Sequence, residues 1–154
     1  MAFDPRVRLA TSDDAAEIAR LMHRFDTEYY SDIDEPEKLE RRYREQLEAG
    51  DVTVILADEQ LGFAQLRFRK QVYSDAPAAY VEELYVVPDR RGEGLGRALM
   101  EAAVETARAD GADVIDLGTA TDDTAARGLY ESLGFTNREG GPDGPSMLYY
   151  ERDL

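Results

Sequence analysis

The chain has 154 residues and is strongly acidic, with 18 lysines and arginines against 33 aspartates and glutamates and a formal net charge of -15. This balance argues against nucleic acid as a partner, because a phosphate backbone is bound by a basic protein surface. The sequence contains no cysteine and one histidine. Disulfides, thiolate metal sites and a cysteine nucleophile are therefore excluded, and a histidine-rich metal site or a Ser-His-Asp triad is disfavoured, so we expect no metal.

The length predicts a single domain over residues 1–154, large enough to bury a core of its own. Residues 1–14 contain no apolar signal segment, and no apolar run approaches membrane-spanning length. We therefore expect a soluble, cytoplasmic protein without a membrane partner.

Apolar periodicity and turn residues predict strands and helices in alternating groups. In the first half these are a strand at Arg6–Ala10, a helix from Thr11 or Ser12 to about Arg24, a helix from Pro36 to Gly50, and strands at Val52–Ala57 and Leu61–Arg69. In the second half they are a strand at Ala79–Val87, a helix that Gly111 ends, a strand at Val114–Thr119, a helix at Thr124–Leu133, and strands at Phe135–Arg138 and Met147–Arg152. Together they predict an α+β fold whose mixed sheet of about seven strands is flanked by about four helices.

The most informative segment is VEELYVVPDRRGEGLGRALM, from Val81 to Met100. Its glycines allow the main chain to approach a ligand closely, and the amides at the start of the following helix attract an anion. Three cations, Arg90, Arg91 and Arg97, surround this turn in an otherwise acidic chain. The segment predicts a loop that binds a phosphate group.

Spacing separates the known kinds of phosphate loop. A Walker loop requires a Lys followed by Ser or Thr after its last glycine, and neither follows here. A dinucleotide loop requires glycine where Arg97 stands. The pattern that remains is Arg91-x-x-Gly94-x-Gly96 directly after a strand. A plain glycine-rich turn from a strand to a helix, with no ligand, is the simpler explanation of the same residues.

This pattern resembles the acyl-CoA pyrophosphate loop of the GNAT superfamily of N-acetyltransferases. About thirty residues later, the sequence from Asp122 to Phe135 ends in LYESLGF and is similar to the family's second signature. The resemblance implies an enzyme that uses acetyl-CoA as its co-substrate. The family's loop contacts then fall on Arg91, Gly92, Glu93, Gly94, Leu95, Gly96 and Arg97, and its contacts to the pantetheine arm on the main chain of Leu84, Tyr85 and Val86.

One family position departs from the pattern. Asp123 stands where the family often has an asparagine that contacts the cofactor. A carboxylate cannot donate the amide hydrogen bond, so Asp123 is either a cofactor contact of another kind or only a helix cap.

The reaction that the resemblance implies is the direct attack of an amine on the thioester in a ternary complex. Glu82 is the favoured general base, with Glu83 in reserve, and strand alternation predicts that the two side chains point to opposite faces of the sheet. Tyr130 matches the family tyrosine that returns a proton to the departing thiolate. Solvated carboxylates and a tyrosine that merely packs are the simpler alternatives for these residues.

The acceptor is less well defined by the sequence. The acidic and aromatic residues between the first two helices, including Tyr29, Tyr30 and Asp32, suit a cationic amine on a small molecule or peptide. Two other functions remain open: a non-catalytic acyl-CoA-binding sensor or partner-binding module of the same fold, and an acidic scaffold whose loop binds nothing. Exposed edge strands also allow a homodimer.

Overall fold

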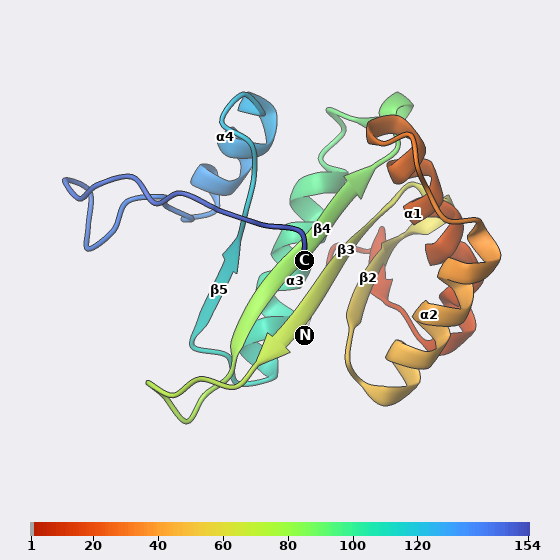
Figure 1. The fold of residues 1–154 in the computed structure, drawn as a ribbon, viewed down its shortest axis with the longest axis horizontal. Coiled ribbons are helices and arrows are strands. Elements are labelled where there is room, and N and C mark those ends of the chain that lie inside the picture. Colours follow the sequence, from red (N-terminus) through yellow and green to blue (C-terminus); the bar gives the residue numbers. More distant parts are fainter. Residues whose placement is uncertain (1) are drawn as a thin grey trace. The chain divides into compact units, whose positions relative to one another are not determined.

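The computed structural model describes residues 2–154 and contains two compact units, residues 1–117 and residues 118–154. The first unit holds β1 (Val7–Leu9), α1 (Ala15–Tyr29), α2 (Pro36–Ala49), β2 (Thr53–Ala57), β3 (Gly62–Arg69), β4 (Ala78–Val86), α3 (Leu95–Ala109) and β5 (Val114–Leu117) (Figure 1). The second unit holds α4 (Thr124–Ser132).

The first unit is built on a five-stranded sheet in the order β1-β2-β3-β4-β5. Neighbouring strands are antiparallel except for β4 and β5, which are parallel and are connected through α3. The structure thus confirms the predicted α+β class and the mixed sheet.

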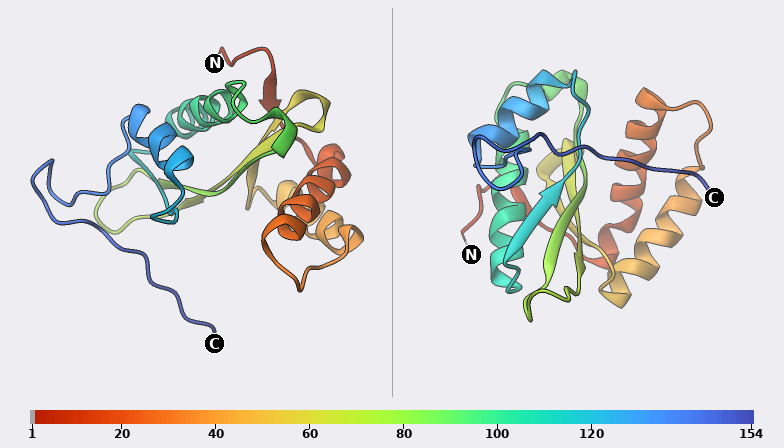
Figure 2. Two further views of the ribbon diagram at one scale, coloured as in Figure 1. Left: turned by 90° about the horizontal axis from the view of Figure 1, so that it is seen from above. Right: turned by 60° about the vertical axis from the view of Figure 1, so that its left-hand side comes forward.

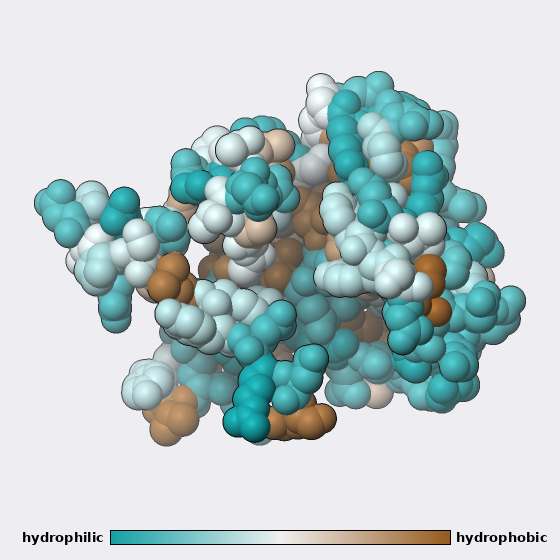
Figure 3. All heavy atoms as spheres, turned by 45° about the horizontal axis from the view of Figure 1, so that its top comes forward, coloured by the Kyte–Doolittle hydropathy of each residue, from teal (hydrophilic) through white to brown (hydrophobic). Residues whose placement is uncertain are grey.

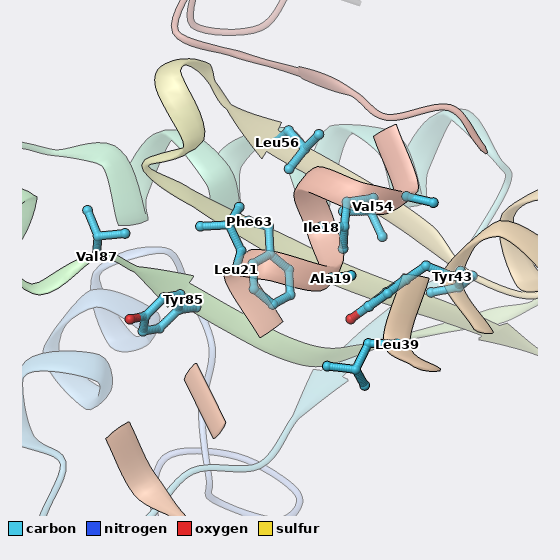
Figure 4. Packing of buried hydrophobic residues seen from close by; sticks show 12 residues of the cluster. Ile18, Ala19, Leu21, Leu39, Tyr43, Val54, Leu56, Phe63, Tyr85 and Val87 are labelled. Atoms are coloured by element: carbon cyan, nitrogen blue, oxygen red, sulfur yellow. The ribbon is translucent and has the colours of Figure 1, made fainter. Parts of the chain in front are cut away.

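Two helical layers cover this sheet. Helices α1 and α2 lie on one face and α3 lies on the other, as the right-hand view of Figure 2 shows. The core between the sheet and the first layer contains Ile18 and Leu21 of α1, Val54 of β2, Phe63 of β3 and Tyr85 of β4 (Figure 4). Tyr85, near the end of β4, is therefore packed within this apolar cluster, with its ring centre 6.3 Å from that of Phe63.

Helix α2 begins and ends at residues whose backbone preferences suit a helix terminus. Pro36 opens α2, where its missing N–H costs nothing, and Gly50 ends α2 in the left-handed region with a φ of 74°. Helix α1 continues to Tyr29, five residues beyond the end predicted from the sequence. The loop between the two helices is correspondingly shorter than expected.

The predicted count of about seven strands is wrong, because the two C-terminal strands are not formed. Beyond α4, the described residues contain a single isolated bridge, between Arg138 and Ser146. The turn between them carries Gly140 and Gly141 with positive φ values, and no ladder continues from the bridge. A strand-like sequence does not form a strand without a partner ladder, and Met147 to Leu154 stays exposed.

The surface reflects the acidic composition. Most of the atoms visible in Figure 3 belong to hydrophilic residues, with apolar groups showing in recesses and along the lower edge of this view. Within residues 2–154, no helix has both the length and the apolar character needed to cross a membrane. The same residues hold no group of three or more histidine, cysteine, aspartate or glutamate side chains arranged to bind a metal ion.

A close approach between β3 and β4 requires glycine at position 62. A Cβ atom built on Gly62 would lie 2.4 Å from the carbonyl oxygen of Tyr85. We expect Gly62→Ala to lower the free energy of unfolding by about 2–4 kcal/mol, because main-chain atoms must move to accept the methyl group. Urea unfolding measures this effect.

Gly128→Ala is the matched control, since Gly128 lies within α4 and has nothing within 4 Å of its added Cβ. This variant should be neutral or more stable by up to about 1 kcal/mol. Equal stabilities for Gly62→Ala and the wild type would contradict the packing argument.

Candidate active site

The glycine loop lies directly between β4 and α3. Gly92 and Gly94 have φ values of 81° and 84°, in the left-handed region that favours glycine, and Gly94 is the N-cap of the fifteen-residue helix α3. Residues 91–94 are exposed. Helix α3 therefore begins at an exposed, glycine-shaped turn, and the N-terminal end of a helix behind such a turn is an arrangement that attracts a phosphate group.

The charges around this loop are more balanced than the sequence suggests. Arg90 forms an ion pair with Glu93 at 2.6 Å, and Arg97 lies 3.7 Å from Glu101. Because these arginines are paired with glutamates, attraction of an anion to the loop depends mainly on the main-chain amides.

Arg91 joins the loop to the end of α1. Its two terminal nitrogens each lie 3.0 Å from one carboxylate oxygen of Glu28, and its Nε donates to the carbonyl oxygen of Val86 at 2.9 Å. The Tyr85 hydroxyl donates to the same carboxylate at 3.1 Å, and the Arg91 guanidinium lies 5.7 Å from the centre of the Tyr85 ring. The hydrogen bond from Arg91 lowers the pKa of Glu28, so this pair is ionised at neutral pH.

Arg6 contacts the glycine loop, which the sequence did not indicate. Its side chain donates to the carbonyl oxygen of Glu93 at 3.1 Å while it pairs with Asp4 at 2.8 Å. Nothing in the local sequence marks this arginine, because the contact depends on how the N-terminal strand lies beside α3.

The main chain of β4 has one side that is paired over only half of its length. Its parallel ladder with β5 ends at the pair Val81 and Leu117, whereas its ladder with β3 continues to Val86. Leu84, Tyr85 and Val86 thus lie beyond the last β4–β5 pair. This is where the sequence placed main-chain contacts to an extended ligand.

A β-bulge changes how the two glutamates of β4 are directed. Gln65 pairs with Glu83 and Leu66 pairs with Val81, so Glu82 is an extra residue in β4. Cross-strand partners share a face of the sheet, which puts Glu83 on the face of Gln65, and the Gln65 side chain also bonds to Glu82. The prediction that the glutamates point to opposite faces is therefore wrong: both lie on the face covered by α1 and α2.

The two carboxylates have different surroundings. Oε2 of Glu82 accepts hydrogen bonds from Gln65 Nε2 at 2.6 Å and from Arg67 Nε at 2.7 Å. Glu83 is half-buried and forms no comparable ion pair among the contacts described for residues 2–154. Glu82 is thus held by its neighbours, whereas Glu83 is the freer of the two.

Burial raises the pKa of Glu83 from 4.5 to about 7, with further contributions from the negative charges of Glu82 and Asp26. A carboxyl group with this pKa exchanges a proton readily near neutral pH, as a general base must. Strand alternation in the sequence could not show that the pKa of Glu83 is raised, because this depends on the bulge and on Asp26 of α1.

A pocket of about 340 Å³ lies between α1 and α2. Two of the three residues predicted to bind the acceptor, Tyr30 and Asp32, line it, whereas Tyr29 does not. The full lining is Asp26, Tyr30, Asp32, Ile33, Asp34, Leu39 and Arg42.

The charge of this pocket is negative on balance. Arg42 and Lys38 pair with Asp34 at 2.6 Å and 3.4 Å, so Asp34 is largely neutralised. Burial raises the pKa of Asp26, the pocket residue whose charge also acts on Glu83. Asp26 thus connects the pocket electrostatically with Glu83.

The second unit holds the remaining predicted residues. Tyr130 lies in α4, is half-buried, and has its ring 6.0 Å from that of Phe135. Asp123 caps α4, because its Oδ1 accepts a hydrogen bond from the Ala126 amide at 3.1 Å. The capping role that the sequence offered for Asp123 is therefore present.

Comparison with known proteins agrees with this geometry. The model of the acetyltransferase (GNAT) family matches residues 16–135. The uncharacterized N-acetyltransferase YhfO of Bacillus subtilis (strain 168) is 31% identical over 137 residues, which are 87% of this chain and 91% of that protein. Aminoglycoside N(6')-acetyltransferase type 1 of Stenotrophomonas maltophilia is 29% identical over 143 residues, which are 90% of this chain and 91% of that protein.

A solved structure extends the similarity to the whole chain. A protein of Arthrobacter sp. FB24 that is assigned to the acetyltransferases has a TM-score of 0.89 and 40% identity, covering 100% of this chain and 99% of that chain. The chain described here belongs to the GNAT family of acetyltransferases.

The raised pKa of Glu83 makes stability depend on pH. The folded-state pKa of about 7 lies above the ordinary value of 4.5, so the contribution of this group to stability is complete below pH 4.5 and is lost as the pH rises through about 7. Glu83→Gln removes this loss. We expect the variant to match the wild type near pH 4.5 and to exceed it by on the order of 1–2 kcal/mol at pH 8, measured by urea unfolding.

Glu82→Gln is the matched control, because it leaves Arg67 without its ionic partner. It should destabilise the protein at pH 8 by about 1 kcal/mol. A Glu83→Gln variant that is less stable than the wild type at pH 8 would contradict the assignment of a raised pKa to Glu83.

Proposed function

We propose that this chain is an acetyl-CoA-dependent N-acetyltransferase and that residues 1–154 form its single catalytic domain. The observation that carries the proposal is the course of β4, which presents a proton acceptor with a pKa of about 7 and then leads into the glycine loop at the start of α3. One strand thus supplies both a base and the approach to an anion site. The GNAT membership supports acetyl-CoA as the donor.

The residues present fit this co-substrate. The amides from Gly92 to Arg97 would hold its pyrophosphate, since Gly92 and Gly94 give the loop the backbone form that a phosphate group requires. The main chain of Leu84, Tyr85 and Val86 would hold the pantetheine arm, since these residues lie beyond the last pair of the β4–β5 ladder. Asp123 is used as the cap of α4.

The proposed reaction is direct. The amine nitrogen attacks the thioester carbonyl carbon, a C–N bond forms and the C–S bond breaks. Glu83 takes the proton from the amine, directly or through water, and Tyr130 gives a proton to the departing thiolate. Glu82, which the sequence favoured as the base, is the less suitable of the two glutamates because Gln65 and Arg67 already occupy its carboxylate.

The proposed acceptor is a cationic primary amine on a small molecule or peptide. The pocket between α1 and α2 supports this class, because Asp26 and Asp32 line it beside the aromatic ring of Tyr30. The aminoglycoside acetyltransferase of S. maltophilia, by its name, acts on a substrate of this kind. Tyr29 ends α1 and packs on Phe25, with ring centres 5.1 Å apart, so we assign it a supporting role.

The alternative is a non-catalytic acyl-CoA-binding sensor of the same fold. Such a protein requires the glycine loop but neither a proton acceptor with a pKa of about 7 nor the tyrosine of α4. Turnover therefore distinguishes the two functions, whereas binding does not.

Binding of the co-substrate is the first test of the proposal. Calorimetric titration with acetyl-CoA should give saturable binding to the wild type and at least about tenfold weaker binding to Gly94→Glu, which strains a residue at a φ of 84° and adds a negative charge. Gly50→Glu is the matched control, because Gly50 has a φ of 74° at the end of α2 and lies outside the loop. Absence of binding to the wild type would reject the proposed function.

Turnover is measured by CoA release with a panel of cationic amines. The value of kcat/KM should rise with pH and level off above about pH 7, where Glu83 is ionised. Glu83→Gln and Tyr130→Phe should each lower kcat by about 100-fold while the affinity for acetyl-CoA is retained. Unchanged turnover in either variant would remove that residue from the mechanism, and binding without turnover for any amine would favour the sensor.

A further inference from the structure

A chain of hydrogen bonds lies behind the two glutamates of β4. The Tyr43 hydroxyl of α2 donates to Oε1 of Gln65 at 2.6 Å, and Nε2 of Gln65 donates to Oε2 of Glu82 at 2.6 Å. Gln65 is 5% exposed and Tyr43 is 7% exposed. A buried polar chain of this kind is expensive unless every member is satisfied, and here every member has a partner.

Arg67 completes the set of contacts to Glu82. Its Nε donates to Oε2 of Glu82 at 2.7 Å, and its Nη1 donates to the carbonyl oxygen of Asp51 at 3.1 Å. A carboxylate oxygen with two donors, each fixed at its other end, has little freedom to turn. Glu82 is therefore held in one position by neighbours on β3.

The hydrogen bonds of this chain run in one direction, from Tyr43 through Gln65 to Glu82. Burial, with the charges of Glu83 and Glu82, raises the pKa of Tyr43, so its hydroxyl stays protonated and acts as the donor. The amide of Gln65 must then turn its oxygen to Tyr43 and its nitrogen to Glu82, since the opposite orientation would bring two acceptors together at Glu82 and two donors together at Tyr43. The nitrogen of Gln65 and the guanidinium of Arg67 thus both donate to the same carboxylate oxygen of Glu82.

We propose that Tyr43 and Gln65 are positioning residues that, together with Arg67, hold the Glu82 carboxylate in place beside Glu83 and thereby control when Glu83 can take up a proton. This inference rests on the proposed function, in which Glu83 is the base. Neither Tyr43 nor Gln65 contacts the reacting atoms in this scheme, and both act through Glu82.

The charged groups that face Glu83 come from all the elements packed against it. Glu82 on β4 and Asp26 on α1 are negative, and Tyr43 on α2 is neutral. Arg67 on β3 is positive and pairs with Glu82. His23 also acts on Asp26 from within α1. Of these groups, Glu82 is the one whose place is determined by the hydrogen-bond chain.

The experiment is a titration of Glu83 that needs no turnover. Carbon-13-labelled glutamate would be incorporated, the carboxyl resonance of Glu83 identified by its loss in Glu83→Gln, and its titration midpoint measured in the wild type, Gln65→Met and Tyr43→Phe. Without Gln65, the Glu82 carboxylate is free to turn toward water, and this change weakens the effect of its charge on Glu83.

We expect the Glu83 midpoint to fall by about 0.5 pH unit or more in Gln65→Met and by a smaller amount in Tyr43→Phe. The rising limb of the pH–rate profile should move with it. Tyr43→Phe removes one oxygen only, so it keeps the test available if Gln65→Met does not fold.

Thr106→Val is the matched control, because Thr106 is 3% exposed on α3, across the sheet, and its hydroxyl donates to the Ala102 carbonyl at 2.8 Å. It should lower stability without moving the midpoint. Midpoints equal to the wild type in both Tyr43→Phe and Gln65→Met would overturn the inference and leave these residues with a purely structural role. If the Glu83 midpoint falls in these variants but the protein transfers no acetyl group to any amine, the control of Glu83 by the hydrogen-bond chain is supported and the proposed function is rejected.

Discussion

One extra residue in β4 determines how the candidate site is built. In a regular strand, Glu82 and Glu83 would face opposite layers of the fold, one toward α3 and the other toward α1 and α2. The bulge between the pairs Gln65–Glu83 and Leu66–Val81 brings both carboxylates to the same layer. The pairing of Gln65 and Arg67 with one glutamate, and the burial of the other, both depend on that local change in register.

The bulge also explains why two adjacent glutamates have different surroundings. Two like charges in a poorly solvated place cannot both ionise freely, so the protein resolves the conflict by giving one of them donors. Glu82 receives an amide and a guanidinium, and Glu83 receives neither. The neighbouring pocket is likewise acidic, with Asp26 adding its charge to that of Glu82 at Glu83. In the proposed reaction, an ammonium group that enters this region would relieve repulsion between the carboxylates and would bring its own proton close to Glu83.

Much of the fold could be predicted from the sequence, since local signals specify it. Apolar periodicity located the helices, Gly50 and Gly111 marked helix ends with positive φ values, and the glycine loop followed from the need for Gly92 and Gly94 in the left-handed region. The C-terminal strands could not be predicted, because a strand depends on a partner and Arg138–Ser146 is the sole bridge found among the described residues beyond α4. The ranking of Glu82 and Glu83 failed for a similar reason. A bulge is a property of two strands together, and the sequence of β4 alone shows two consecutive glutamates in a pattern of regular alternation.

The pairing of each loop arginine with an acidic side chain has a consequence for how fast a ligand arrives. Arg90, Arg91 and Arg97 are offset nearby by Glu93, Glu28 and Glu101, so the loop does little to counter the -15 charge of the whole chain. An anion approaching from a distance is repelled until it is close enough to meet the loop amides. Salt at physiological concentration shortens the reach of that repulsion to about 8 Å. The encounter with an anionic co-substrate should therefore become faster as salt is added, the reverse of the behaviour of enzymes that attract their substrates over long distances.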